Sequence, residues 1–128
     1  MKFIHISKDD DERIVSAIVM QGTPPELEKD PHVDTQGEWY KMATVQTAAG
    51  ELMEKNEKVC FDVQHAGGQC FFFKILENFV ADEDMSKWGQ SIKKGAWVMT
   101  VHVDDQQVWK QIKNGKLNAF SVAGTAEV

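Results

Sequence analysis

The sequence of 128 residues contains no apolar run close to the ~20 residues that a membrane-spanning helix needs. Its first residues, MKFIHISKDDDERIV, lack the apolar core and the small-residue cleavage site of a secretory signal. Its basic residues are scattered and its net charge is −6, whereas binding to a phosphate backbone requires clustered cations. We therefore expect a protein of the cytoplasm that contacts neither a membrane nor a nucleic acid.

Cysteine is also scarce, because Cys60 and Cys70 are the only two in the chain and they flank His65. Three ligands do not complete a tetrahedral zinc site, and the spacing matches none of the usual short Cys-x₂₋₄-Cys motifs. Both cysteines lie in apolar strand patterns, where a free cysteine packs as a small hydrophobic residue, and a disulfide is not expected in a reducing cytoplasm. The sequence thus predicts two buried thiols, no metal and no cofactor.

The apolar patterns predict a single α+β domain over residues 1–128. Segment 21–40 holds all three prolines and is expected to be a functional or flexible loop, and segment 81–95 a polar loop with a helical turn. Trp97 and Trp109 are expected in the core. Lys110, Lys113 and Lys116 are expected on a solvated helix face or just beyond its end. The predicted strands are residues 13–20, 59–65, 70–80, 97–103 and 117–124, and the predicted helices are 40–56 and one capped by Asp104 or Asp105 that ends near Gly115. These elements favour a mainly antiparallel sheet or small barrel flanked by helices.

Ser121 and His65 are the candidate catalytic pair. A serine hydroxyl is a weak nucleophile near neutral pH, so it needs an imidazole to take its proton and a third group to orient that imidazole. Ser121 lies in the last predicted strand and His65 ends the predicted strand 59–65. The residues alone leave an alternative open, in which Ser121 is an ordinary small strand residue and His65 a structural histidine at a strand end.

The segment GAWVMTVHVDDQQVWKQIKNGKLNAFSVAG, residues 95–124, is similar to the phage serine protease family typified by XkdF. Upstream, RIVSAIVM resembles the opening strand of the family, VDTQGEWY its Asp-x-x-Gly element and FDVQH its histidine strand. The resemblance implies the fold of the prohead proteases, which are related to the herpesvirus assembly proteases and have an antiparallel barrel surrounded by helices. It also implies that Ser121 is the nucleophile and His65 the general base.

The same resemblance implies a role and a place of action. Prohead proteases cleave scaffold and major capsid proteins inside the assembling procapsid, in the cytoplasm of the bacterial host, and often work as dimers. We therefore expect a phage or prophage endopeptidase. The alternative is a catalytically silent module of the same fold that binds scaffold or capsid proteins during assembly.

The third catalytic residue is not determined by the resemblance. Relatives carry a second histidine or a carboxylate after the serine strand, whereas only seven residues, among them Glu127, follow Ser121 here. His102 on a neighbouring strand is our candidate, with a structural or exposed histidine as the alternative. Regular alternation would place Asp62 on the opposite face of its strand from His65. The sequence also leaves open whether residues 1–128 lack a C-terminal portion of the domain.

Overall fold

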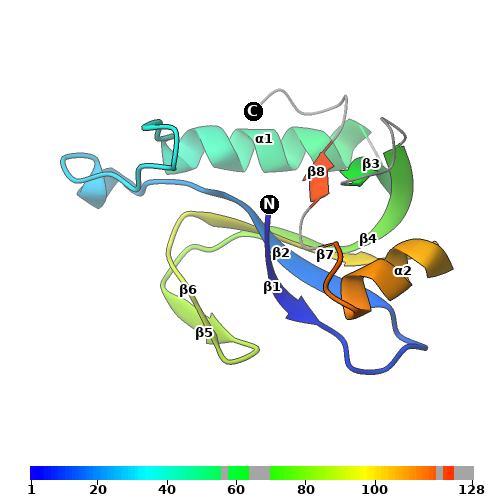
Figure 1. Ribbon diagram of the computed structural model, residues 1–128. Helices are drawn as coiled ribbons and strands as arrows, with labels where there is room; N and C mark the ends of the chain where they lie inside the picture. The colour runs from blue at the N-terminus through cyan, green and yellow to red at the C-terminus, as the bar shows by residue number, and fades with distance from the viewer. Residues whose placement is uncertain (56–57, 64–69, 118–119, 123–128) are drawn as a thin grey trace.

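The computed structural model describes residues 1–55, 58–63, 70–117 and 120–122 (Figure 1). Within these ranges the chain forms eight strands, two α-helices and one short 3₁₀ helix. None of the helices in the described ranges has the length and apolar character required to cross a membrane. In chain order the elements are β1 (Lys2–Ile6), β2 (Ile14–Gln21), the 3₁₀ helix η1 (Pro25–Leu27), α1 (Met42–Lys55), β3 (Lys58–Val63), β4 (Cys70–Val80), β5 (Met85–Lys87), β6 (Gln90–Ile92), β7 (Ala96–His102), α2 (Gln106–Lys113) and β8 (Phe120–Val122).

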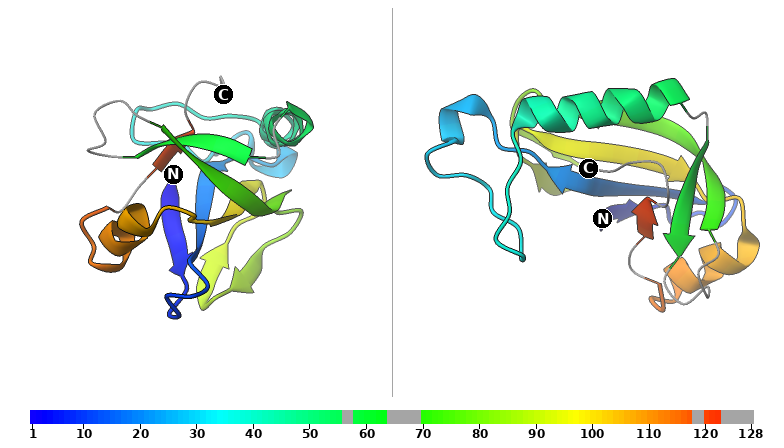
Figure 2. Two further views of the ribbon diagram at one scale, coloured as in Figure 1. Left: turned by 90° about the vertical axis from the view of Figure 1, so that its right-hand side faces the viewer. Right: turned by 90° about the horizontal axis from the view of Figure 1, so that it is seen from above.

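Six strands form one sheet in the order β1-β2-β7-β4-β3-β8, and all of its neighbouring pairs are antiparallel. The sheet curls, so the first residues of β1 lie close to β8 in all three views (Figures 1 and 2). The predicted α+β class with a mainly antiparallel sheet and two helices is confirmed. The strand β1, which had not been predicted from the sequence, pairs with β2 and forms one edge of the sheet.

Opposite faces of the sheet are covered by different elements. α1 lies along one face, and its residues Val45, Ala49 and Leu52 join the main core with the side chains of Phe61 and Trp97. The hairpin of β5 and β6 covers the other face, where a second cluster forms. Because both faces are covered, every residue of β7 except the last is buried. The members of the second cluster are Ala81, Ile92, Ala96 and Val98.

The amphipathic pattern of α1 was predicted correctly at most positions. Met42, Val45, Ala49 and Leu52 are buried as expected, whereas Met53, which had been placed on the same stripe, is 43% exposed. Met53 follows Leu52 by one position, about 100° around the helix, and therefore lies beyond the face that touches the sheet. The predicted core positions of Trp97 and Trp109 are confirmed, with exposures of 0% and 3%.

The predicted polar loop 81–95 is wrong in its central part, because β5 and β6 pair as a short antiparallel hairpin. Its two turn residues, Trp88 and Gly89, both have positive φ angles of 55° and 72°, which the twist of a two-residue hairpin turn requires. The indole of Trp88 stacks on His5 of β1 with ring centroids 5.2 Å apart, and Lys87 pairs with Glu77 of β4 at 3.1 Å. These contacts hold the hairpin against the sheet.

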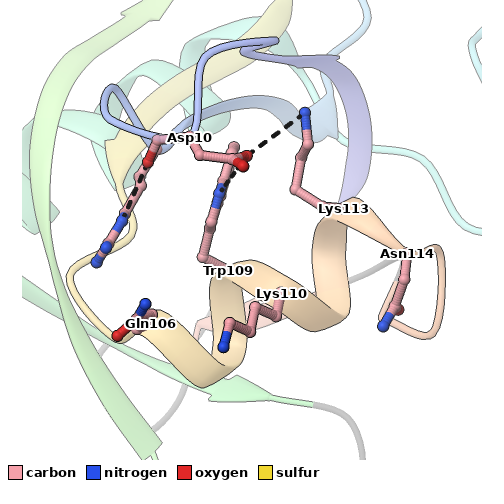
Figure 3. A pocket seen from close by; sticks show the side chains of 7 residues that line it. Asp10, Gln106, Trp109, Lys110, Lys113 and Asn114 are labelled. Carbon is pink, nitrogen blue, oxygen red and sulfur yellow. Dashed lines mark hydrogen bonds and ion pairs between the residues drawn. The ribbon is translucent and has the colours of Figure 1, made fainter.

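The helix α2 is held by its cap and by the loop between β1 and β2. Asp105 is the N-cap, because its carboxylate accepts a hydrogen bond from the backbone N–H of Val108 at 2.9 Å. Figure 3 shows the second contact: Asp10 accepts a hydrogen bond from Trp109 Nε1 at 3.1 Å and pairs with Lys113 at 3.8 Å. Lys113 also donates a hydrogen bond to the backbone carbonyl of Lys8 at 3.1 Å, so it holds α2 against the loop between β1 and β2. Lys113 is exposed, as predicted, and these contacts show that it also joins α2 to the loop between β1 and β2.

The prediction for the cysteines requires a correction as well. Cys60 is buried, as expected, but it is disulfide-bonded and not a free thiol. The chain has one other cysteine, Cys70, and the register of β3 and β4 places Cys70 opposite Asp62, two positions along from Cys60. Within the described residues no group of three histidine, cysteine or acidic side chains could hold a metal ion.

Candidate active site

Ser121 is the middle residue of the edge strand β8, which pairs with β3 through three residue pairs. In this register Ser121 lies opposite Asp62, and Asp62 lies opposite Cys70 of β4. The structure therefore places the predicted nucleophile beside the strand whose sequence continues to His65. Sequence patterns had not identified Asp62 as the neighbour of Ser121, because pairing between distant strands leaves no local signal.

His65 belongs to residues 64–69, which lie outside the described part of the chain. The strand β3 ends at Val63, two residues before it. The predicted extension of this strand to residue 65 is therefore not described by the structure. Glu127, the carboxylate that follows Ser121 in the sequence, also lies outside the described residues.

His102 is the last residue of β7, directly before the α2 cap. Its Nδ1 lies 2.5 Å from Asp104 Oδ1, so the two side chains form a hydrogen-bonded pair at the surface. The backbone carbonyl of Asp104 also accepts a hydrogen bond from Arg13 Nη1 at 3.4 Å. This arrangement favours the structural alternative that the sequence left open for His102, in which its ring fixes the turn between β7 and α2.

The register of the sheet also gives the position of His102 relative to β8. His102 lies opposite Lys74, and Lys74 lies opposite Lys58. Lys58 is four residues before the position that pairs with Ser121, which corresponds to roughly 13 Å along the strand. β7 and β8 are also three strand spacings apart in the sheet order, or about 14 Å across a flat sheet. The assignment of His102 to the catalytic set remains a prediction.

A family model described as "Putative phage serine protease XkdF" matches residues 2–128 of the chain. The uncharacterized protein YqbD of Bacillus subtilis (strain 168) is 35% identical over 97 residues, which are 74% of this chain and 28% of YqbD. The phage-like element PBSX protein XkdF of the same strain is 32% identical over 125 residues, which are 95% of this chain and 40% of that protein. The chain thus spans less than half the length of either relative.

No solved structure matches the chain significantly, so the fold rests on the elements and pairings described above. The family match extends over nearly the whole sequence and includes the strand of Ser121. This chain belongs to the XkdF family of phage serine protease-like proteins.

Proposed function

We propose that the chain is a serine endopeptidase domain of a phage or prophage, in which Ser121 is the nucleophile and His65 the general base. The observation that carries this proposal is the pairing of β8 with β3, because it brings Ser121 beside the strand that leads to His65. The proposed substrates are the scaffold and major capsid proteins, cleaved within the assembling procapsid in the host cytoplasm. A homodimer is the proposed working form.

In this chemistry His65 takes up and gives back a proton twice, once as the acyl-serine forms and once as it is hydrolysed. As Ser121 Oγ attacks the scissile carbonyl carbon, His65 takes the hydroxyl proton, and it then gives this proton to the leaving amine when the C–N bond breaks. A water molecule then attacks the acyl-serine ester and loses a proton to His65, and His65 returns this proton to Ser121 Oγ as the ester C–O bond breaks and the acid product leaves. A positioned general base of this kind typically contributes about 10²–10⁴-fold to the rate.

The covalent chain limits how far His65 can be from Ser121. Paired residues on antiparallel strands have Cα atoms about 5 Å apart, which applies to Asp62 and Ser121. His65 follows Asp62 by three positions, a stretch that spans at most about 11 Å. The Cα atoms of His65 and Ser121 are therefore within about 16 Å of each other in any conformation, a distance that a change of direction after Val63 can close.

One feature of the register favours the silent alternative. Residues that lie opposite each other in an antiparallel pair share a face of the sheet, so the position of Ser121 is on the face of Asp62. If β3 continued as a regular strand, residue 65 would share the face of Phe61, whose side chain is fully buried in the core. Catalysis therefore requires the backbone to leave regular strand geometry between Val63 and His65, and a module without this departure would bind scaffold or capsid protein without cleaving it.

The proposal is tested with Ser121→Ala and His65→Ala variants of the chain, each incubated with the cognate scaffold and major capsid proteins. We expect a fluorophosphonate probe to label the wild type at Ser121, and both substitutions to abolish labelling and cleavage. The matched control is Ser91→Ala, because Ser91 is an exposed strand serine on the separate hairpin. Binding of the substrate proteins without cleavage or labelling by the wild type would establish the silent module instead.

Two further variants identify the residue that orients His65. Asp62→Asn removes the carboxylate at the position opposite Ser121, and we expect it to lower kcat by at least about tenfold if this carboxylate orients the base. His102→Ala removes the predicted third member, whose ring is already bonded to Asp104. A loss of activity in His102→Ala comparable to that in His65→Ala would confirm the prediction from sequence, and wild-type activity would assign His102 to the turn alone.

A further inference from the structure

A second candidate site lies at the end of β2, beside the long loop that follows this strand. Here a surface pocket of about 300 Å³ is enclosed by the end of β2 and by the loop. Its wall includes the apolar side chains of Val19, Met20 and Val33 and the ring of Tyr40, and its rim carries the carboxylates of Asp34 and Glu38. The pocket therefore combines an apolar surface with two negative charges.

The loop is fixed in place by hydrogen bonds to a buried threonine. Thr23 is fully buried, its N–H donates to the carbonyl of Tyr40 at 2.8 Å, and its own carbonyl accepts from the N–H of Met42 at 2.8 Å. Its hydroxyl oxygen accepts a hydrogen bond from the N–H of His32 at 3.0 Å. Both ends and the middle of the loop are thus anchored to one residue, so the pocket wall is formed before any ligand arrives.

The acidic rim is equally well ordered. Asp34 Oδ1 accepts hydrogen bonds from the N–H groups of Gln36 and Glu38, both at 2.9 Å, and the N–H of Asp34 donates to the carbonyl of Glu38 at 2.8 Å. Glu38 Oε2 accepts a hydrogen bond from the hydroxyl of Tyr40 at 2.9 Å. This hydrogen bond raises the pKa of Tyr40, so the phenol remains a donor to the carboxylate.

The donors at the rim are all neutral, so they leave the charge of the two carboxylates uncompensated. Within residues 1–55, 58–63, 70–117 and 120–122, no lysine or arginine forms an ion pair with Asp34 or Glu38. Lys41 follows Glu38 by only three positions, but it forms its ion pair with Glu28, at 3.8 Å. The net charge of −6 adds a long-range attraction for cations to this local deficit of positive charge.

Exposed apolar residues flank the same turn. Val33 is 55% exposed and Trp39 is 37% exposed, although large apolar side chains are usually buried. They stand on either side of the ordered 34–38 turn, which projects from the body of the protein in Figure 2. An ordered loop that presents an aromatic residue next to a charged pocket is a typical feature of a protein-binding surface.

We propose that this pocket binds the side chain of a lysine or arginine in an extended segment of a partner protein. The aliphatic stem of such a side chain would pack along Val19 and Val33, while its cationic head would reach the carboxylates of Asp34 and Glu38. The volume suits one long side chain, and Trp39 would cover the residues next to it. This binding site does not depend on catalysis at Ser121, because it is built from β2 and the loop and not from β3 and β8.

The test uses the Ser121→Ala protein, so that no cleavage interferes, and a glycine–serine peptide that carries one central lysine. Its counterpart carries norleucine, which has the same aliphatic stem without the charge. We expect the lysine peptide to shift the backbone amide resonances of Val19, Val33 and Tyr40 in NMR titrations at pH 8, and to bind at least about fivefold more tightly than the norleucine peptide.

Two variants locate the interaction. Glu38→Gln keeps an acceptor for Tyr40 but removes the charge, and should weaken the lysine peptide about three- to tenfold. Glu51→Gln, an exposed change on α1, is the matched control and should leave the affinity unchanged. Because Glu38→Gln could disturb the loop, Val33→Ser tests the apolar wall separately and should weaken both peptides.

Three results would overturn the proposal. The first is equal affinity for the lysine and norleucine peptides, and the second is a set of shifted resonances away from the pocket. The third is equally tight binding of free cadaverine, which would assign the pocket to small amines and not to a polypeptide.

Discussion

The contact between Gly22 and Gly95 gives the sharpest test of the packing. Gly95 lies just before β7 with a φ of 94°, and its carbonyl accepts a hydrogen bond from the N–H of Gly22 at 2.8 Å. A Cβ atom added at Gly95 would lie only 2.4 Å from the backbone oxygen of Gly22. Because neither backbone can rotate away as a side chain would, Gly95→Ala requires the end of β2 to separate from the start of β7.

The expected loss of stability has two parts. An L-residue in the left-handed region costs about 1–2 kcal/mol. The forced separation also breaks or weakens two backbone hydrogen bonds, from Gly22 to Gly95 at 2.8 Å and from Gly95 to Ala81 at 2.9 Å, each of which contributes about 0.5–1.5 kcal/mol. Gly95→Ala should therefore lower the free energy of unfolding by about 2–5 kcal/mol, a large part of the 5–15 kcal/mol typical of a domain.

Two other glycines provide matched controls for the same chemical change. Gly89 also has a positive φ, of 72°, but no atom lies within 4 Å of an added Cβ, so Gly89→Ala should show only the conformational penalty of about 1–2 kcal/mol. Gly50 lies in α1 with open space around it, and Gly50→Ala should stabilise the protein by about 0.5–1 kcal/mol.

Urea unfolding followed by tryptophan fluorescence measures all three variants, with an unchanged m-value as the check that the folded and unfolded states are comparable. We expect Gly95→Ala to be less stable than Gly89→Ala by about 2 kcal/mol. Agreement of the two variants within about 0.5 kcal/mol would refute the close approach of the two backbones.

Three further predictions concern other contacts. Thr100→Val removes the 2.8 Å partner of the fully buried Ser16 hydroxyl and should lower the free energy of unfolding by about 1–3 kcal/mol in urea, with a smaller effect in a Ser16→Ala background. The pKa of Glu77 is lowered chiefly because Lys87 donates a hydrogen bond to it, so its stabilisation is present at neutral pH and is lost as the pH falls below the usual 4.5. Glu77→Gln should accordingly flatten the acid side of a stability curve, and an unchanged curve would contradict this. Reduction of the Cys60 disulfide, which closes a loop of about ten residues, should lower stability by about 2–3 kcal/mol, and free thiols before reduction would refute its presence.

The helices and long strands could be predicted because their signals are local. The stripe of Val45, Ala49 and Leu52 defined α1, and Asp105 with Gly115 bounded α2. The hairpin of β5 and β6 has strands of three residues each, too short for a periodic pattern, and its turn uses Trp88 at a φ of 55° where sequence rules expect asparagine, aspartate or glycine. Its stability comes from packing on the sheet, which no local pattern records.

From the sequence, the candidate site could be predicted only as two residues, Ser121 and His65, in segments that resemble a protease family. The position of Ser121 opposite Asp62 depends on the register between strands almost sixty residues apart, and this register is set by tertiary packing. The same limit applies to His102. Its partner Asp104 is close in sequence, but its distance from β8 depends on the order of the strands in the sheet.

The central place of β7 has a consequence for folding during synthesis. β2 and β4 both pair with β7, although β7 comes after both of them in the sequence. The nearer one, β4, ends at Val80, sixteen positions before β7 begins at Ala96. Until the ribosome has released residues 96–102, β2 and β4 each expose an unpaired, largely apolar edge, which is the kind of surface that chaperones bind and that aggregates. We therefore expect nascent chains arrested before residue 96 to bind chaperone, and chains that extend past β7 to be released from it.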